Sequence, residues 1–500
     1  MKPETDLVKE EMTGPKNSRV ASNFLWRLFE RFGAQGVTLV VSIVLARILD
    51  PEDYGTIALV TVFISILSVF VTSGVNDALI QKKDADELDF SSMFFFNIVL
   101  CLFLYALMFV SAPGIARFYR RPDLVPYIRV LSLLLVCSGV KNIQSAYVSR
   151  HMLFKRFFFA TLGGTVAAAV VGIWMALKGC GVWALIVQNL VNSTLDTLIL
   201  WLTVKWRPKL MFSMKRLKAL LAYAWKLTAS ALVDTVYNRL YQLIIGKKYT
   251  DLDLAYYNKG DTFPNLLVTS INSATDSVLL PMLSAAQESR ERVKEMTRRA
   301  IKLSSYVIMP VMFGFAAVAE PTIRLLLTDK WLPCVPYLRI FCVTYAFFCV
   351  HVANLNAIKA LGRSDLYLKL EVVKKLVGLS VVLVSMWYGV YVMALSSLLT
   401  SVLSQLINSW PNRKLLGYGY GEQLKDMLPH LLLSGGMALA VYALGLLGLG
   451  DLPTLILQIL LGAALYVVGS LLLKLDSFTY ILTLIRPFLP GGRGAGEDKA

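Results

Sequence analysis

Apolar stretches of about 20 residues recur along the whole chain, and a helix needs this length to cross a bilayer core of roughly 30 Å. Of the 500 residues, 56% are hydrophobic and 17% are charged, against roughly 45–50% and about 25% in soluble domains. The sequence therefore predicts an all-α polytopic membrane protein with about fourteen transmembrane helices. We expect them at residues 22–49, 55–80, 90–112, 122–145, 157–177, 181–204, 219–246, 254–283, 300–327, 335–361, 366–388, 390–410, 431–449 and 452–473.

The basic residues lie mainly in the connectors between the apolar segments, although the net charge of +17 alone would also suit a nucleic-acid partner. Twenty lysines and arginines lie in the connectors after even-numbered helices, and 8 lie in or next to the other connectors. The positive-inside rule assigns the richer set to the cytoplasm. We therefore expect two cytoplasmic termini and no nucleic-acid partner. Residues 1–20 contain no apolar run, so we expect no cleavable signal peptide.

A weak duplication relates the two halves of the chain. Three segments recur in the same order, at offsets of 200, 210 and 208 residues: ARILDPEDYG at Ala46 and GKKYTDLDLA at Gly246, VPYIRV at Val125 and VPYLRI at Val335, and GVWAL at Gly181 and GVYVMAL at Gly389. Chance similarity among leucine-rich helices explains the VPY pair poorly. Because six helices form an even-numbered unit, both copies insert with the same orientation. We expect two parallel six-helix lobes around a central cavity, plus two extra C-terminal helices.

The duplication also predicts the domain boundaries. We expect a cytoplasmic tail at 1–21, an N-lobe at 22–204, a basic cytoplasmic linker at 205–218 and a C-lobe at 219–410. A cytoplasmic connector at 411–430 then leads to helices thirteen and fourteen at 431–473, and a cytoplasmic tail follows at 474–500.

Four segments carry a family resemblance: VLARILDPEDYGTIALV, LKGCGVWALIVQ, YYNKGDTFPNLLVTSINSATDSVLLPMLSAAQ and TDKWLPCVPYLRIF. Over residues 22–412 the chain resembles the polysaccharide exporters, or oligosaccharide flippases, of the multidrug/oligosaccharidyl-lipid/polysaccharide superfamily. The subgroup most similar to it exports colanic-acid-like or teichuronic-acid-like polysaccharide. The resemblance implies a flippase that moves undecaprenyl-diphosphate-linked oligosaccharide across the bacterial plasma membrane. It further implies no catalytic site and no cofactor, with membrane lipids and polysaccharide polymerase machinery as partners.

Three other functions stay open at this point. A drug/cation antiporter of the same superfamily would need a carboxylate site for its coupling ion, and Asp196, Asp234 and Asp276 are candidates for one. A lipid flippase for the peptidoglycan precursor would also have fourteen helices. A membrane polysaccharide polymerase or ligase should carry a large catalytic outer loop, whereas every outer connector here is short. ATP hydrolysis is not expected, because the sequence lacks a Walker A motif.

Ionisable residues within predicted helices are candidates for contacts with the diphosphate and sugars of such a cargo, because charges are costly in a bilayer. In helix one, Arg27, Glu30 and Arg31 are spaced three and four residues apart, which puts them on one helix face. Two cations and a carboxylate there would line a cavity. The alternative is that all three lie at the cytoplasmic interface and extend their charged ends into water.

Helix seven carries a polar stripe at four-residue spacing, made of Lys226, Ser230, Asp234 and Asn238. The duplication puts Lys226 near the position equivalent to Arg27, so we expect both cations to face the cavity. Alternatively, Lys226 pairs with a neighbouring carboxylate or extends toward the interface. Helix eight adds Lys259 to the candidates.

Arg129 and Arg339 hold the same position in the two copies of the VPY segment, where helices four and ten begin on the predicted outer side. We interpret both as residues that extend into the outer interface. The six cysteines and three histidines show no metal-ligand spacing, so we expect neither a disulfide framework nor a metal site.

Overall fold

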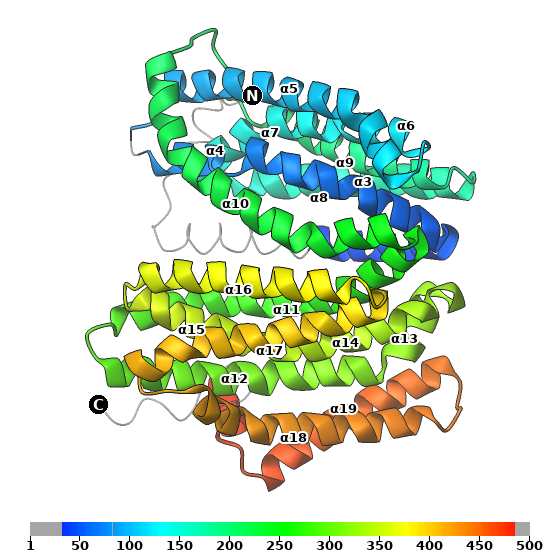
Figure 1. Cartoon of the computed structure of the whole chain (residues 1–500), viewed down its shortest axis with the longest axis vertical. Coiled ribbons are helices and arrows are strands. Elements are labelled where there is room, and N and C mark those ends of the chain that lie inside the picture. Colours follow the sequence, from blue (N-terminus) through cyan, green and yellow to red (C-terminus); the bar gives the residue numbers. More distant parts are fainter. Residues whose placement is uncertain (1–32, 83, 486–500) are drawn as a thin grey trace, which may run out of the picture. The chain divides into compact units, whose positions relative to one another are not determined.

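The computed structural model describes residues 33–82 and 84–485, and every regular element within these ranges is a helix. Among these residues, eleven helices are long and apolar enough to cross a membrane. The predicted all-α, multi-pass membrane architecture is therefore confirmed. The chain divides into two compact units, one ending at Ala255 and the other beginning at Tyr256 (Figure 1).

Unit 1 begins with a described helix at 33–48. It continues through α3 (Pro51–Thr72), α4 (Val75–Gln81), α5 (Glu87–Tyr119), α6 (Leu124–Leu131), α7 (Leu133–Arg150), α8 (Phe154–Leu177), α9 (Val182–Thr203) and α10 (Met214–Lys248). Its core joins Met93 of α5, Ile143 of α7 and Leu220 of α10. α10 packs on α3, α4 and α5 and so belongs to unit 1 (Figure 1). The lobe boundaries expected from the duplication stay a prediction, because a repeat and a compact unit need not end at the same residue.

Unit 2 contains most of α11 (Asp251–Ala285), then α12 (Arg290–Ala317), α13 (Ala319–Leu327), the 3-10 helix η1 (Asp329–Cys334), α14 (Val335–Ala346), α15 (Phe348–Ala360), α16 (Ser364–Ser385), α17 (Val390–Leu415), α18 (Tyr420–Gly445), α19 (Asp451–Leu472) and α20 (Asp476–Ile485). The helices expected as thirteen and fourteen are α18 and α19, which lie beside α12 (Figure 1). Tyr306 of α12, Met437 of α18 and Tyr466 of α19 form a shared core. The two extra helices are therefore part of unit 2.

Three of the fourteen expected spans are not among the eleven apolar ones. The described part of helix one is short, at 33–48. Helix seven corresponds to α10 and helix eleven to α16, and both carry several charged residues. The count of fourteen membrane-spanning helices therefore stays a prediction. The charged residues of α10 and α16 are the reason why these two helices are not among the apolar ones.

The first repeated segment forms the same turn in both copies. In the first copy, the backbone N–H of Asp50 donates to Asp53 Oδ2 at 3.3 Å, at the start of α3. In the second copy, the N–H of Thr250 donates to Asp253 Oδ2 at 3.2 Å, at the start of α11. Each Asp thus satisfies a backbone donor just before its helix begins, as helix N-termini require.

The other two repeated segments also agree in local structure. Arg129 Nε donates to the carbonyl of Phe109, Arg339 Nε donates to the carbonyl of Ala316, and both distances are 3.3 Å. The helices α9 and α17 each follow a glycine with positive φ, Gly181 at 53° and Gly389 at 107°, where a side chain would be strained. These shared geometries support the duplication.

Candidate functional site

The polar stripe of helix seven lies on the exposed face of α10. Leu220 and Ala224 are buried in the core of unit 1, and they set the direction of the packed face. Lys226 and Asp234 are both exposed, and so are Ser230 and Asn238. The four-residue spacing therefore predicts correctly that these side chains share a face, and the structure adds that all four residues are exposed.

Lys226 has no salt bridge or hydrogen bond within the described part of the chain. Asp234 takes part in an interaction of its own, and it lies eight residues from Lys226, about 12 Å along the helix axis. Pairing of Lys226 with a nearby carboxylate, the alternative considered from the sequence, is thus not what the described residues show. An exposed cation in a long helix of a membrane protein requires water or an anion beside it.

Lys259 has different surroundings. It lies on α11 in unit 2 with only 5% of its surface exposed. Its Nζ is 5.3 Å from the ring centroid of Trp331 and 6.0 Å from that of Phe263, which are distances of cation–π contact. Lys226 and Lys259 belong to different units.

Three candidates, Arg27, Glu30 and Arg31, lie outside the described residues. Convergence of the candidate cations on one cavity therefore stays a prediction.

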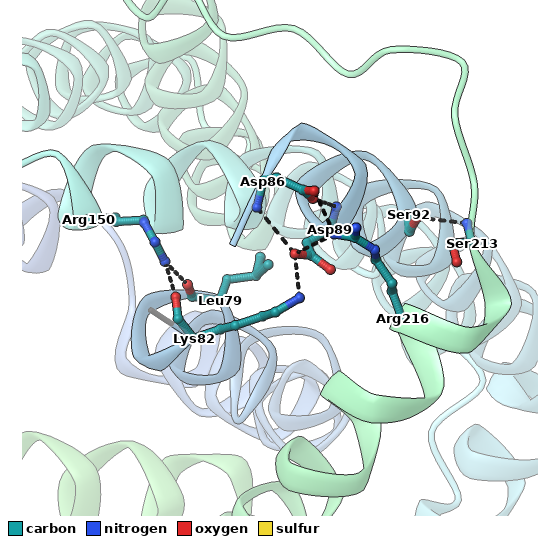
Figure 2. A network of polar contacts seen from close by, with 8 residues as sticks. All are labelled: Leu79, Lys82, Asp86, Asp89, Ser92, Arg150, Ser213 and Arg216. Atoms are coloured by element: carbon teal, nitrogen blue, oxygen red, sulfur yellow. Dashed lines mark hydrogen bonds and ion pairs between the residues drawn. The ribbon is translucent and has the colours of Figure 1, made fainter. Parts of the chain in front are cut away.

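A charged network, which we call the Asp89 network, ties the start of α10 to the turn between α4 and α5 (Figure 2). Asp89 is completely buried, and its Oδ2 accepts from Lys82 Nζ at 2.5 Å and from Arg216 Nη1 at 3.3 Å. Arg216 also donates to Asp86 Oδ2 at 2.6 Å. The N–H of Asp89 and then the guanidinium of Arg216 lower the pKa of Asp86. The network holds the first turn of α10 against α5.

Two further contacts complete this corner of unit 1 (Figure 2). The N–H of Ser213 donates to Ser92 Oγ at 2.9 Å, which fixes the residue before α10. Arg150 Nη1 donates to the carbonyls of Leu79 and Lys82 at 2.8 and 2.5 Å, and so satisfies carbonyls at the end of α4. Lys82, Arg150 and Arg216 belong to the basic residues of the connectors, from which the sequence predicts orientation and not pairing. The acidic run DADELD beside them is the pattern that would have indicated pairing.

A second buried polar cluster joins α15, α16 and α17 in unit 2. Lys374 Nζ donates to Glu371 Oε1 at 2.6 Å and lies 3.4 Å from His351 Nε2. Asn408 Nδ2 is 2.8 Å from His351 Nδ1. Spacing in the sequence does not indicate these partners of His351, because they lie on two later helices. Among the carboxylates considered for ion coupling, Asp196 forms an ion pair with Lys141, and Asp276 accepts from Asn356 at 2.6 Å.

Comparison with known proteins gives consistent results. The family model described as "Polysaccharide biosynthesis protein" matches residues 44–336. The succinoglycan biosynthesis transport protein ExoT of Rhizobium meliloti (strain 1021) is 24% identical over 64% of this chain and 65% of its own length. The lipopolysaccharide biosynthesis protein WzxC of Escherichia coli (strain K12) is 24% identical over 83% of this chain and 86% of its own. The teichuronic acid biosynthesis protein TuaB of Bacillus subtilis (strain 168) is 24% identical over 77% and 80%.

Solved structures share the fold. The lipid II flippase MurJ in an inward closed conformation matches with a TM-score of 0.73 and 15% identity, over 93% of this chain and all of that one. An inward-facing multidrug resistance MATE family transporter of the MOP superfamily matches with a TM-score of 0.60 and 15% identity, over 76% and 94%. At this identity the matches establish the fold alone.

Proposed function

The chain belongs to the polysaccharide biosynthesis protein family, and on that premise we propose that it is a flippase for a lipid-linked oligosaccharide. Its cargo is a glycan on undecaprenyl diphosphate, which it moves by alternating access from the inner to the outer leaflet of the bacterial plasma membrane. Both termini of the chain lie in the cytoplasm. The exported glycan then serves surface polysaccharide synthesis, with polymerase machinery as a partner outside this chain.

The observation that carries this proposal is the unpaired cation on the exposed face of α10. A lysine within a membrane helix is costly, up to about 2.5–3.5 kcal/mol at the helix centre on insertion scales, so its retention calls for a compensating role. Lys226 has no partner among the described residues that would neutralise it. The diphosphate of the cargo is a dianion with strong acceptor oxygens, and it supplies the missing charge through charge-assisted hydrogen bonds.

An apolar groove between α18 and α19 supports a lipid tail on the cargo. Its volume is about 790 Å³, within the roughly 300–1,000 Å³ of small-molecule sites. Leu432, Gly436 and Met437 of α18 line one wall, and Val468 and Leu472 of α19 line the other. The absence of a side chain at Gly436 leaves open space at that wall, because no atom lies within 4 Å of where its Cβ would be. The apolar lining of this groove suits a polyprenyl chain.

The test is to replace Lys226 by Gln in cells where this chain is the exporter, and to measure surface polysaccharide together with the lipid-linked precursor. One charge-assisted hydrogen bond is worth about 1.5–3 kcal/mol, so we expect affinity for the cargo to fall about tenfold or more. Surface polysaccharide should fall, and the precursor should accumulate.

The matched control is Lys218→Gln, which removes the same charge from an exposed position near the beginning of the same helix. Both variants must reach wild-type abundance in the membrane. Normal export by Lys226→Gln at normal abundance would contradict the proposed role of this cation. Export of cationic drugs without any effect on the precursor would favour the antiporter.

A further inference from the structure

A second polar pocket lies in unit 2, beside the first turns of α13 and α14 and where α18 turns into α19. Its volume is about 350 Å³, which lies within the range of small-molecule sites. The side chains that matter for its chemistry are Glu320, Arg324, Arg339, Tyr442, Asp451 and Gln458. The turn between α18 and α19 is on the side that the charge distribution predicts to be outside. The pocket is thus remote from the predicted cytoplasmic connectors.

One cation of this pocket has unused hydrogen-bonding capacity. Arg339 Nε donates to the carbonyl of Ala316 at 3.3 Å, and the guanidinium carbon lies 5.2 Å from the ring centroid of Tyr442. Its Nη2 is buried and has no hydrogen-bond partner in the described part of the chain. A buried donor without an acceptor costs about 1–3 kcal/mol, so a molecule in the pocket is expected to supply one.

The other charged groups of the pocket already pair with one another. Arg324 donates to Glu320 Oε1 at 3.1 Å and to Asp451 Oδ1 at 3.1 Å, and it also donates to Asp329 at 3.0 Å outside the pocket lining. Each of these carboxylates keeps capacity to accept further hydrogen bonds. The pocket therefore offers acceptors as well as donors, and it has no excess of positive charge.

Gln458 adds a buried acceptor. Only 1% of this residue is exposed. Its Nε2 donates to the carbonyl of Val441 at 2.9 Å, whereas its Oε1 has no partner within the described ranges. The pocket thus combines an unpaired donor on Arg339 with an unpaired acceptor on Gln458, beside the aromatic face of Tyr442.

We propose that this pocket binds sugar rings of a glycan on the outer side of the membrane. A hydroxyl group donates and accepts at once, so a saccharide can satisfy Arg339 and Gln458 together, while the apolar face of a ring packs on Tyr442. A phosphate is an anion that mainly accepts hydrogen bonds, and it would be repelled by the two carboxylates. The choice of a glycan as ligand rests on the proposed function, and the pocket would receive the headgroup after translocation.

The duplicated arginine of unit 1 shows what the pocket requires. Arg129 of α6 makes the equivalent 3.3 Å hydrogen bond to the backbone carbonyl of Phe109 in α5. Its guanidinium carbon lies 4.2 Å from the ring centroid of the same phenylalanine. The wall around Arg339 comes from α18 and α19, which lie outside the six-helix repeat. Both arginines are predicted to lie at the outer interface, but their surroundings differ between the copies. Arg339 has the wall of α18 and α19 beside it.

The experiment measures saccharide binding to the purified full-length protein in lipid nanodiscs by saturation-transfer NMR. The probes are cellobiose and the oligosaccharide released by mild acid from the lipid-linked precursor of producing cells. We expect binding to the wild type, and at least a tenfold loss of affinity in Arg339→Met and in Tyr442→Ala. Arg129→Met is the matched control and should bind like the wild type. Tyr442 is 43% exposed, so its truncation keeps the test valid if Arg339→Met does not fold.

Several results would overturn the pocket assignment. They are no saccharide binding by the wild type, equal binding by the wild type and both pocket variants, an equal loss in Arg129→Met, and displacement of the saccharide by inorganic phosphate. The first of these would mean that water alone fills the pocket. None of these results would change the outcome of the export measurement with Lys226→Gln. A wrong pocket assignment can therefore be distinguished from a wrong proposed function.

Discussion

Asp86 and Asp89 provide a controlled comparison of burial, because both carboxylates contact Arg216 and they stand three residues apart. The side chain of Asp89 is 0% exposed and that of Asp86 is 49% exposed. Replacing each by Asn keeps the shape and removes the charge. Asn is as good an N-cap as Asp, so Asp86→Asn keeps the helix cap that Asp86 gives the N–H of Asp89 at 3.0 Å.

The two losses should differ severalfold. Hydrogen bonds to charged groups are worth about 1.5–3 kcal/mol, and Asp89 accepts one from Lys82 at 2.5 Å and one from Arg216 at 3.3 Å. Both cations keep about a third of their surface in solvent, so removing Asp89 does not strand a fully buried charge. We expect Asp89→Asn to lower the free energy of unfolding by about 2–4 kcal/mol. We expect Asp86→Asn to cost less than about 1 kcal/mol.

The assay is reversible unfolding of the purified protein by SDS in mixed micelles, followed by tryptophan fluorescence. Both variants are compared with the wild type at pH 7, with far-ultraviolet circular dichroism as a check that helix content is unchanged. Equal losses for the two variants, or a loss below 1 kcal/mol for Asp89→Asn, would refute the argument that burial sets the strength of this network.

Three further predictions concern pH dependence, close packing and topology. The lowered pKa of Asp86 means that its stabilising contribution is present above the ordinary Asp pKa of about 4 and is lost as pH falls through the folded-state value. The difference in melting temperature between the wild type and Asp86→Asn should therefore shrink from pH 6 to pH 3. Gly55→Ala should destabilise by about 1–3 kcal/mol in the same SDS assay, because its Cβ would lie 1.9 Å from the carbonyl oxygen of Asp251. Gly114→Ala should cost nothing, since no atom lies within 4 Å of that Cβ. A single cysteine at Ser213, in a background without other cysteines, should react with an impermeant maleimide only after the membrane is opened, and labelling of intact cells would contradict the predicted topology.

Hydropathy located the helices well because the apolar face of a membrane helix must be continuous, but it located their ends and breaks less well. α12 begins at Arg290, ten residues before the expected start, and Ser289 Oγ accepts from the N–H of Arg292 at that end. Charge marks where a helix leaves the bilayer and does not end the helix itself. The expected helices four and ten are interrupted at Ser132 and Phe347, inside apolar runs that carry no local sign of a break.

The candidate site was predictable only where spacing within one helix decides the outcome. That Lys226 shares a face with Asp234 follows from the four-residue spacing of the polar stripe, whereas the burial of Lys259 depends on Trp331, which comes from a distant segment. The pairing of Asp89 with Arg216 likewise joins two connectors. A count of lysines and arginines gives orientation, but it cannot give partners, since partners are set by how the helices pack.

The position of α10 has a consequence for biosynthesis. Leu217, Leu220 and Ala224 of this helix complete the core that α4, α5 and α7 begin. While the helices up to α9 are already in the membrane and α10 is still in the ribosome, that core has an open side, and Asp89 lacks Arg216. Unit 1 is therefore finished only when about half of the chain has been synthesised. During that interval the nascent chain must shelter an incomplete apolar face and a half-neutralised carboxylate, either against the insertion machinery or against lipid.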